Sequence, residues 1–335
     1  MRQAGGGCAL PGALSRIEEE VLVFLPERLR RQVAETLSRY PDGMLSRLAE
    51  IRVRAGLPCT LLIGGLEVLA GNGTPYVVSG EDVDRMFNLI SANSVHAFEE
   101  ELRNGYITVR GGHRIGMAGK AILEAGKVRA IKHVRSFNIR VTRDCPGAAN
   151  LVIPHLIENS RPQSSLIVGP PGSGKTTMLR EISRLLSVGL PEYGVPPQNV
   201  GIADERSEIA GCYRGVPQND VGPRTDVLDG CPKAEGMMML IRAMAPNVII
   251  TDEIGAADDA QACVEASCAG VAVVASAHGA GKTDLMNRPS LKRLLSPGTF
   301  TRIVLLSCRR GPGTVDEICD PRGATLVRGA AGGAL

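Results

Sequence analysis

The chain has 335 residues, a formal net charge of +3, 44% hydrophobic and 22% charged residues, which indicates a soluble globular protein with room for two domains. This charge is too small to identify a polyanionic partner, and 3% aromatic residues without tryptophan argue against stacking platforms for single-stranded nucleic acid. The 9 cysteines contain no C-x-x-C pair, which argues against a zinc ribbon or redox motif and suits a reducing compartment. We recognise no signal peptide and no apolar run long enough to cross a bilayer, so membrane association is expected to go through a partner.

The first part of the chain, 14–146, is predicted to form a small α+β domain behind a mobile tail, 1–13. Apolar residues recur at helical spacing over 14–37 and predict one or two amphipathic helices. Short apolar runs at 51–53 and 60–63, separated by Gly and Pro, predict strands. Ser79 to Asp82 fit a capping box that opens a helix, and another helix is expected around Val95 to Leu102.

A β-hairpin is predicted next, because 106–110 and 113–117 flank Gly111-Gly112, the composition of a tight turn. Two more strands are expected at 128–134 and 137–141. The hairpin region is basic, with Arg110, Arg114, Arg129, Lys132, Arg135, Arg140 and Arg143. A solvated sheet edge and a contact with a nucleotide or a neighbouring subunit are both open interpretations.

The second part, 147–310, is predicted to be an α/β domain with a mostly parallel sheet, because strand and helix patterns alternate in it. It follows a turn at 144–147 and opens with a helix expected from Ala148 to about Glu158. Five strands are expected, at 166–168, 200–203, 248–251, 271–275 and 303–306. The remaining segment, 311–335, is expected to carry one short hairpin and a tail.

A phosphate-binding loop lies between the first of these five strands and the helix that follows it. Residues 169–176 fit G-x-x-x-x-G-K-[ST], the Walker A pattern, with strand, loop and helix in the required order. Glycines in the loop let successive N–H groups point at one anion, and the helix adds the positive end of its dipole. Lys175 would reach the β and γ phosphates of ATP, and the Thr176 hydroxyl would contact Mg²⁺. The predicted nucleotide-binding residues are Gly169, Pro170, Pro171, Gly172, Ser173, Gly174, Lys175, Thr176 and Thr177.

Acidic residues and a histidine follow three of the other predicted strands. Asp252 and Glu253 end an apolar strand, and the carboxyl ends of strands in open α/β sheets are where ligands bind. Asp252 is expected to hold Mg²⁺ through water, and Glu253 to orient the attacking water. Glu205 belongs to an acidic group that should open onto the same edge, and His278 could sense the γ phosphate or orient the catalytic acid. The predicted catalytic residues are Glu253, Lys175, His278 and Glu205.

Four arginines near these strands, Arg206, Arg214, Arg224 and Arg242, are candidates for charge stabilisation from a neighbouring subunit. Solvation at the surface stays the alternative for each of them.

The sequence resembles the stage III sporulation protein AA family of endospore-forming bacteria. The resemblance is carried by GPPGSGKTTMLREISRLL, IADERSEIAG, the stretch from Cys212 to Gly255 and the N-terminal GYITVRGGHRIGMAG, so it runs through nearly the whole chain. More distantly, the chain is similar to the ATPases of type II and type IV secretion and of type IV pili. In that comparison residues 204–208 correspond to the acidic box and His278 to the histidine box. Two positions depart from the pattern: Arg242 lies one place out of register with the arginine of those ATPases, and Asp252 stands where they usually have glycine.

The resemblance implies a P-loop NTPase of the AAA+ group with a RecA-like core behind a small N-terminal domain, acting with ATP and Mg²⁺ as a homo-hexamer. It also implies a motor that powers a secretion-like or feeding channel in endospore formation. The protein would then be cytoplasmic, and peripheral at the mother-cell side of the forespore membranes through membrane proteins of the channel complex.

Two other interpretations stay open. A nucleic-acid-remodelling ATPase of the AAA+ or RecA-like type would share the sheet and the loop, although the scarcity of aromatics argues against it. A nucleotide-gated scaffold without turnover would leave Glu253 idle. The stimulation of turnover by DNA or RNA and the effect of a change at Glu253 distinguish these interpretations.

Overall fold

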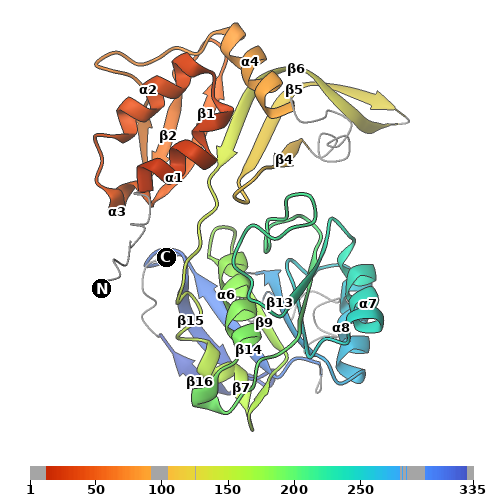
Figure 1. Cartoon of the computed structure of the whole chain (residues 1–335). Helices are drawn as coiled ribbons and strands as arrows, with labels where there is room; N and C mark the ends of the chain where they lie inside the picture. Colours follow the sequence, from red (N-terminus) through yellow and green to blue (C-terminus); the bar gives the residue numbers. More distant parts are fainter. Residues whose placement is uncertain are drawn as a thin grey trace, which may run out of the picture. The chain divides into compact units, whose positions relative to one another are not determined.

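A computed structural model of the chain describes residues 13–91, 105–124, 126–279, 281, 284 and 299–329. The chain folds into two compact units, with the division between Arg143 and Asp144 (Figure 1). The predicted tail up to residue 12 and the predicted helix at Val95 to Leu102 lie outside the described residues. Each unit is described by itself below.

The first unit is an antiparallel sheet with helices packed on it. The strand order is β3-β2-β1-β6-β5-β4. Ile51, Val53 and Phe137 are buried at alternate positions of two central strands, so one sheet face joins the core with Leu29 and Val33 of a helix. The elements are α1 (Ala13–Glu20), η1 (Leu22–Phe24), α2 (Glu27–Leu37), α3 (Asp42–Leu45), α4 (Gly80–Ser91), β1 (Leu48–Arg54), β2 (Thr60–Ile63), β3 (Leu66–Leu69), β4 (Tyr106–Thr108), β5 (Arg114–Glu124) and β6 (Lys127–Arg140).

The capping box and the hairpin predicted for this unit are confirmed. The Ser79 N–H donates to Asp82 Oδ2 at 2.9 Å and the Asp82 N–H donates to Ser79 Oγ at 3.1 Å, immediately before and within the first turn of α4. Gly111 and Gly112, with φ of 83° and 72°, form the turn between β4 and β5. The two strands expected at 128–134 and 137–141 are one strand, β6, because it runs through an irregularity at His133 without ending.

The second unit is an eight-stranded sheet in the order β11-β10-β12-β13-β9-β14-β15-β16, parallel from β11 to β14 and antiparallel beyond. Met178 of α6 belongs to the same buried cluster as Ile167, whereas Met237 of α7 belongs to a second buried cluster with Leu166. The elements are η3 (Ile153–Leu156), β7 (Ile157–Glu158), β8 (Arg161–Pro162), β9 (Ser165–Gly169), α6 (Lys175–Val188), η4 (Pro191–Tyr193), β10 (Val200–Asp204), β11 (Thr225–Asp229), α7 (Lys233–Met244), β12 (Val248–Thr251), α8 (Ala257–Cys268), β13 (Ala272–His278), β14 (Arg302–Ser307), β15 (Thr314–Cys319) and β16 (Thr325–Arg328).

The five strands predicted for this unit are all present, as β9, β10, β12, β13 and β14. The helix predicted from Ala148 to Glu158 is wrong: turns lead to the short 3₁₀ helix η3 and then to β7. Pro154 lies in that segment, and a proline inside an α-helix would remove a backbone donor. Strand β11 was not predicted, because its residues TDVLD contain two aspartates and no apolar run. The segment after 310 provides β15 and β16, which extend the same sheet.

Candidate nucleotide-binding site

The phosphate loop connects β9 to α6 by a tight curl of backbone. Gly172 and Gly174 have φ of 74° and 89°, a region that glycine enters without strain, and Gly174 directly precedes the first residue of α6. A Cβ at Gly169 would lie 2.5 Å from Ser173 Oγ and 3.0 Å from the carbonyl oxygen of Leu306. The loop therefore requires glycine at both ends of its turn, and its backbone N–H groups lie at the start of a helix, where anions bind.

Lys175 is the first residue of α6, and its ammonium contacts the backbone of the loop. Nζ lies 3.0 Å from the carbonyl oxygens of Gly169 and of Pro170, and 3.3 Å from His278 Nδ1. These three acceptors match the three hydrogens of an ammonium group. Burial lowers the pKa of Lys175, and the nearby Glu253 and Asp252 act in the opposite direction. An anion that enters the loop would have to take over some of these donors.

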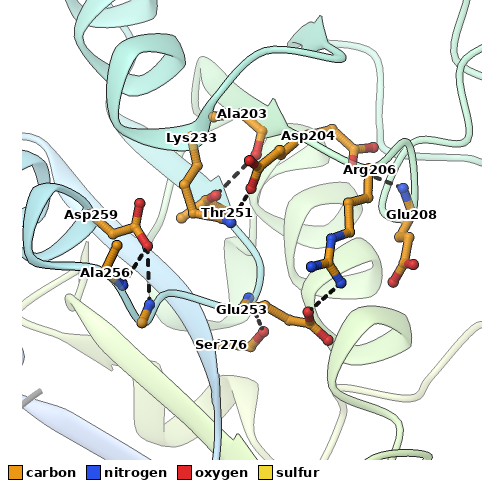
Figure 2. Close-up of polar contacts among 12 residues, drawn as sticks. Ala203, Asp204, Arg206, Glu208, Lys233, Thr251, Glu253, Ala256, Asp259 and Ser276 are labelled. Carbon is orange, nitrogen blue, oxygen red and sulfur yellow. Dashed lines mark hydrogen bonds and ion pairs between the residues drawn. The ribbon is translucent and has the colours of Figure 1, made fainter. Parts of the chain in front are cut away.

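Glu253 lies two residues after β12, and both of its carboxylate oxygens are engaged. Oε1 lies 2.7 Å from Nε2 of His278, the last residue of β13, and Oε2 lies 2.9 Å from Arg206 Nη1. Because Lys175 has only donors, His278 Nδ1 must accept, which assigns the ring hydrogen to Nε2, facing Glu253. The Glu253 backbone has φ of 47°, and its N–H donates to Ser276 Oγ at 3.0 Å (Figure 2).

Asp252 is 1% exposed, and its Oδ2 has no hydrogen-bond partner among the described residues. Burial first, and then the charges of Asp204, Glu208 and Glu253, raise its pKa to about 7. A buried carboxylate oxygen without a donor is suited to a cation, so the site fits Mg²⁺ held through Asp252 together with Thr176. Within the described ranges no three His, Cys, Asp or Glu side chains form a metal site.

In the acidic loop after β10, Asp204 holds the loop backbone by hydrogen bonds. Asp204 is fully buried and accepts N–H groups from Glu208, Ile209 and Ala210 at 2.9 to 3.1 Å. Burial raises the pKa of Asp204, and these N–H groups act in the opposite direction. Arg180 of α6 donates to the carbonyl oxygens of Ile209 at 2.7 Å and of Glu208 at 2.9 Å. The loop is thereby attached to the helix that begins with Lys175.

The structure brings together four of the residues expected at the site and gives the others different surroundings. Lys175, His278, Glu253 and Arg206 form one chain of contacts. Glu205 instead forms an ion pair with Lys233 at the start of α7. Arg214, which lies over the Tyr213 ring, and Arg224 and Arg242 are exposed, and none has a contact with this chain of residues among the described ones.

Three further residues were missed. Arg180 is a buried arginine within α6, Ser276 is a small residue inside a strand, and Lys233 is the first residue of a helix. No local signal in the sequence marks any of them, because their role comes from partners distant in the chain.

Residues 15–326 match the family model described as Sporulation stage III, protein AA. The chain belongs to this family. Stage III sporulation protein AA of Bacillus subtilis (strain 168) is 46% identical over 309 residues, which cover 92% of this chain and 97% of that protein. An uncharacterized protein, ycf45, of Cyanidium caldarium is 35% identical over 146 residues, 43% of this chain and 41% of that protein. The family resemblance noted in the sequence is confirmed.

Among solved structures, the ATPase DotB of Legionella pneumophila has a TM-score of 0.53 and 18% identity, and the match covers 81% of this chain and 74% of that one. DotB of Yersinia pseudotuberculosis has a TM-score of 0.51 and 15% identity, with the same coverage. At such identities the likeness concerns the fold, and it confirms the predicted α/β class with a mostly parallel sheet. No helix of this sporulation stage III protein AA family member, over the described residues, is long and apolar enough to span a membrane.

Proposed function

We propose that this member of the sporulation stage III protein AA family hydrolyses ATP to ADP and phosphate at the loop 169–176. The observation that carries the proposal is the link from Lys175 Nζ through His278 to Glu253, which joins a phosphate loop to a carboxylate at the adjacent strand ends. Lys175 and the N-terminus of α6 would hold the phosphates, and Glu253 would orient water. Mg²⁺, held by Thr176 and Asp252, would supply charge neutralisation of the phosphates.

We further propose that the protein works as a homo-hexameric motor of a secretion-like channel complex in endospore formation. The family membership and the likeness of the fold to an ATPase, DotB, support this proposal. Its partners would be membrane proteins of that complex, which would hold it peripherally at the mother-cell side of the forespore membranes.

Two variants test the hydrolysis proposal. Lys175→Ala should lower ATP turnover by about 100-fold, because it removes the cation that neutralises phosphate charge in the transition state. Glu253→Gln should leave ATP bound while hydrolysis falls by about 100-fold, since the amide no longer accepts a proton from water. Phosphate release and nucleotide retention are measured side by side.

Arg161→Ala, at an exposed arginine of β8, is the matched control and should behave like the parent. Near-normal turnover in Lys175→Ala would remove the loop from the mechanism. Unchanged turnover in Glu253→Gln would instead favour a nucleotide-gated scaffold.

A further inference from the structure

Arg206 forms an ion pair with Glu253, the carboxylate that is proposed to orient water for ATP hydrolysis. Its Nη1 lies 2.9 Å from Glu253 Oε2 (Figure 2). His278 Nε2 lies 2.7 Å from the other oxygen, Oε1. A carboxylate that orients water must present an acceptor oxygen to that water, within hydrogen-bond distance. Each carboxylate oxygen has two acceptor positions, so Arg206 on Oε2 competes with that water without excluding it, and its departure would leave Oε2 fully available.

The loop that carries Arg206 is fixed on both sides of that residue. Asp204 accepts N–H groups from the backbone at 208–210, and the Ser207 hydroxyl donates to Asp229 Oδ1 at 2.5 Å. The Arg206 side chain is nevertheless 57% exposed. Its guanidinium can change partner by side-chain rotation alone, while the backbone of the loop stays attached to α6 through Arg180.

The other end of the same contacts reaches the phosphate loop. Lys175 Nζ uses its three hydrogens on two loop carbonyls at 3.0 Å and on His278 Nδ1 at 3.3 Å. The contact with His278 is the longest of the three, so it is the first that an entering phosphate should replace. Its loss would free the imidazole that contacts Glu253 Oε1, and Arg206 contacts the other oxygen of the same carboxylate.

We infer that Arg206 is a positioning residue with two positions, bound to Glu253 at rest and transferred to the γ phosphate when ATP is bound. This inference rests on the proposed ATP hydrolysis. A terminal phosphate offers a guanidinium several charged acceptors, whereas one Glu253 oxygen offers it a single contact. ADP has no γ phosphate, so Arg206 stays on Glu253 with ADP. Arg206 thus releases Glu253 only when a nucleoside triphosphate is bound.

A binding cycle without hydrolysis tests the inference. Affinities for AMP-PNP and for ADP, both with Mg²⁺, are measured by calorimetry on the full chain for the parent, Arg206→Ala, Glu253→Gln and the double variant. Glu253→Gln removes the negative charge that attracts Arg206. With Arg206 present, this change should therefore tighten AMP-PNP binding about fivefold, the size of a partly exposed ion pair. In the Arg206→Ala background the same change should alter AMP-PNP binding less than about twofold, and ADP should show no such difference.

Arg161→Ala combined with Glu253→Gln is the control background and should repeat the fivefold gain. An equal gain with and without Arg206, or the same dependence on Arg206 for ADP, would overturn the inference and leave the proposed function standing. AMP-PNP binding that Lys175→Ala does not weaken would overturn both, because the loop would then not be the nucleotide site.

Discussion

At the scale of single residues, two buried aspartates at neighbouring strand ends differ in what surrounds them. Asp204 is balanced by three backbone N–H groups, whereas Asp252 Oδ2 has no donor among the described residues. Both have raised pKa values because of burial, and that of Asp252 reaches about 7. Asp204 therefore organises a loop, and Asp252 is the acid whose charge is left for a cation.

The raised pKa of Asp252 predicts that the free energy of unfolding of the metal-free protein depends on pH. The usual value is 3.8 and the folded value about 7, so between these pH values the folded protein keeps a proton that the unfolded chain releases. The free energy of unfolding should therefore fall as pH rises through this window, by about 1.4 kcal/mol for each unit of the shift, and level off above it.

Urea unfolding with chelator, at about pH 5 and about pH 8, measures this dependence, and Asp252→Asn is the reference because asparagine does not titrate in this range. Subtracting the variant removes the contributions of all other groups. The same pH slope in both proteins would mean that Asp252 is ionised at pH 5 in the fold.

At the scale of elements, Arg180 couples the helix that begins the phosphate loop to the acidic loop after β10. It is 7% exposed and donates to two carbonyl oxygens of that loop, those of Glu208 and Ile209. Asn219 also donates to the Ile209 carbonyl, at 3.0 Å. Arg180 therefore links the loop that carries Arg206 to α6. A shift of the first turn of this helix would also displace the loop that faces Glu253.

We expect Arg180→Met to lower the free energy of unfolding by about 2 to 3 kcal/mol, because methionine keeps the aliphatic volume but leaves buried carbonyl oxygens without their charged donor. Limited proteolysis should then cut within 205–210 faster than in the parent, since the loop loses its attachment. Arg161→Met, at an exposed arginine, should leave both measurements unchanged. Parent-like stability of Arg180→Met would show that the contacts of Asp204, Ser207 and Asn219 hold the loop without Arg180.

At the scale of the whole molecule, the assembly proposal requires a cation from another copy of the chain. The exposed Arg135 side chain pairs with Asp84 at 3.7 Å, and Arg114 lies over the Tyr106 ring at 4.0 Å. Arg110 and Arg140 are also exposed. With Arg206 assigned to Glu253 of its own chain, these two N-terminal arginines and Arg224 become the candidates for donation to a neighbouring site.

Activity per subunit should then rise with protein concentration, and at least one of Arg110→Ala, Arg140→Ala and Arg224→Ala should suppress turnover without preventing ATP binding. Mixing that variant with Lys175→Ala subunits should restore part of the rate, because one subunit supplies the arginine and the other the intact loop. Light scattering and phosphate release are measured on the same samples. A rate independent of concentration, with no rescue in any mixture, would mean that the site is complete within one chain.

The features that the sequence predicted correctly are those set by neighbouring residues. The phosphate loop depends on glycines at positive φ between an apolar strand and a helix, all within 165–188, and the Ser79 to Asp82 cap depends on four consecutive residues. The five parallel strands were predicted because strands buried on both faces are continuous apolar runs. Where local pattern and burial disagreed, as in β11 with its aspartates or in the segment around Pro154, the prediction failed.

The sequence by itself determined that a phosphate loop, two strand-end acids and a histidine lie at one edge of a parallel sheet, because parallel strands end on the same side. The tertiary structure decided which of them touch. The order β10-β12-β13-β9 brings Arg206 to Glu253 across 47 residues and His278 to Lys175 across 103, and it gives Glu205 to Lys233 instead. Such pairings depend on strand order and side-chain direction, and no local spacing in the chain encodes either of these.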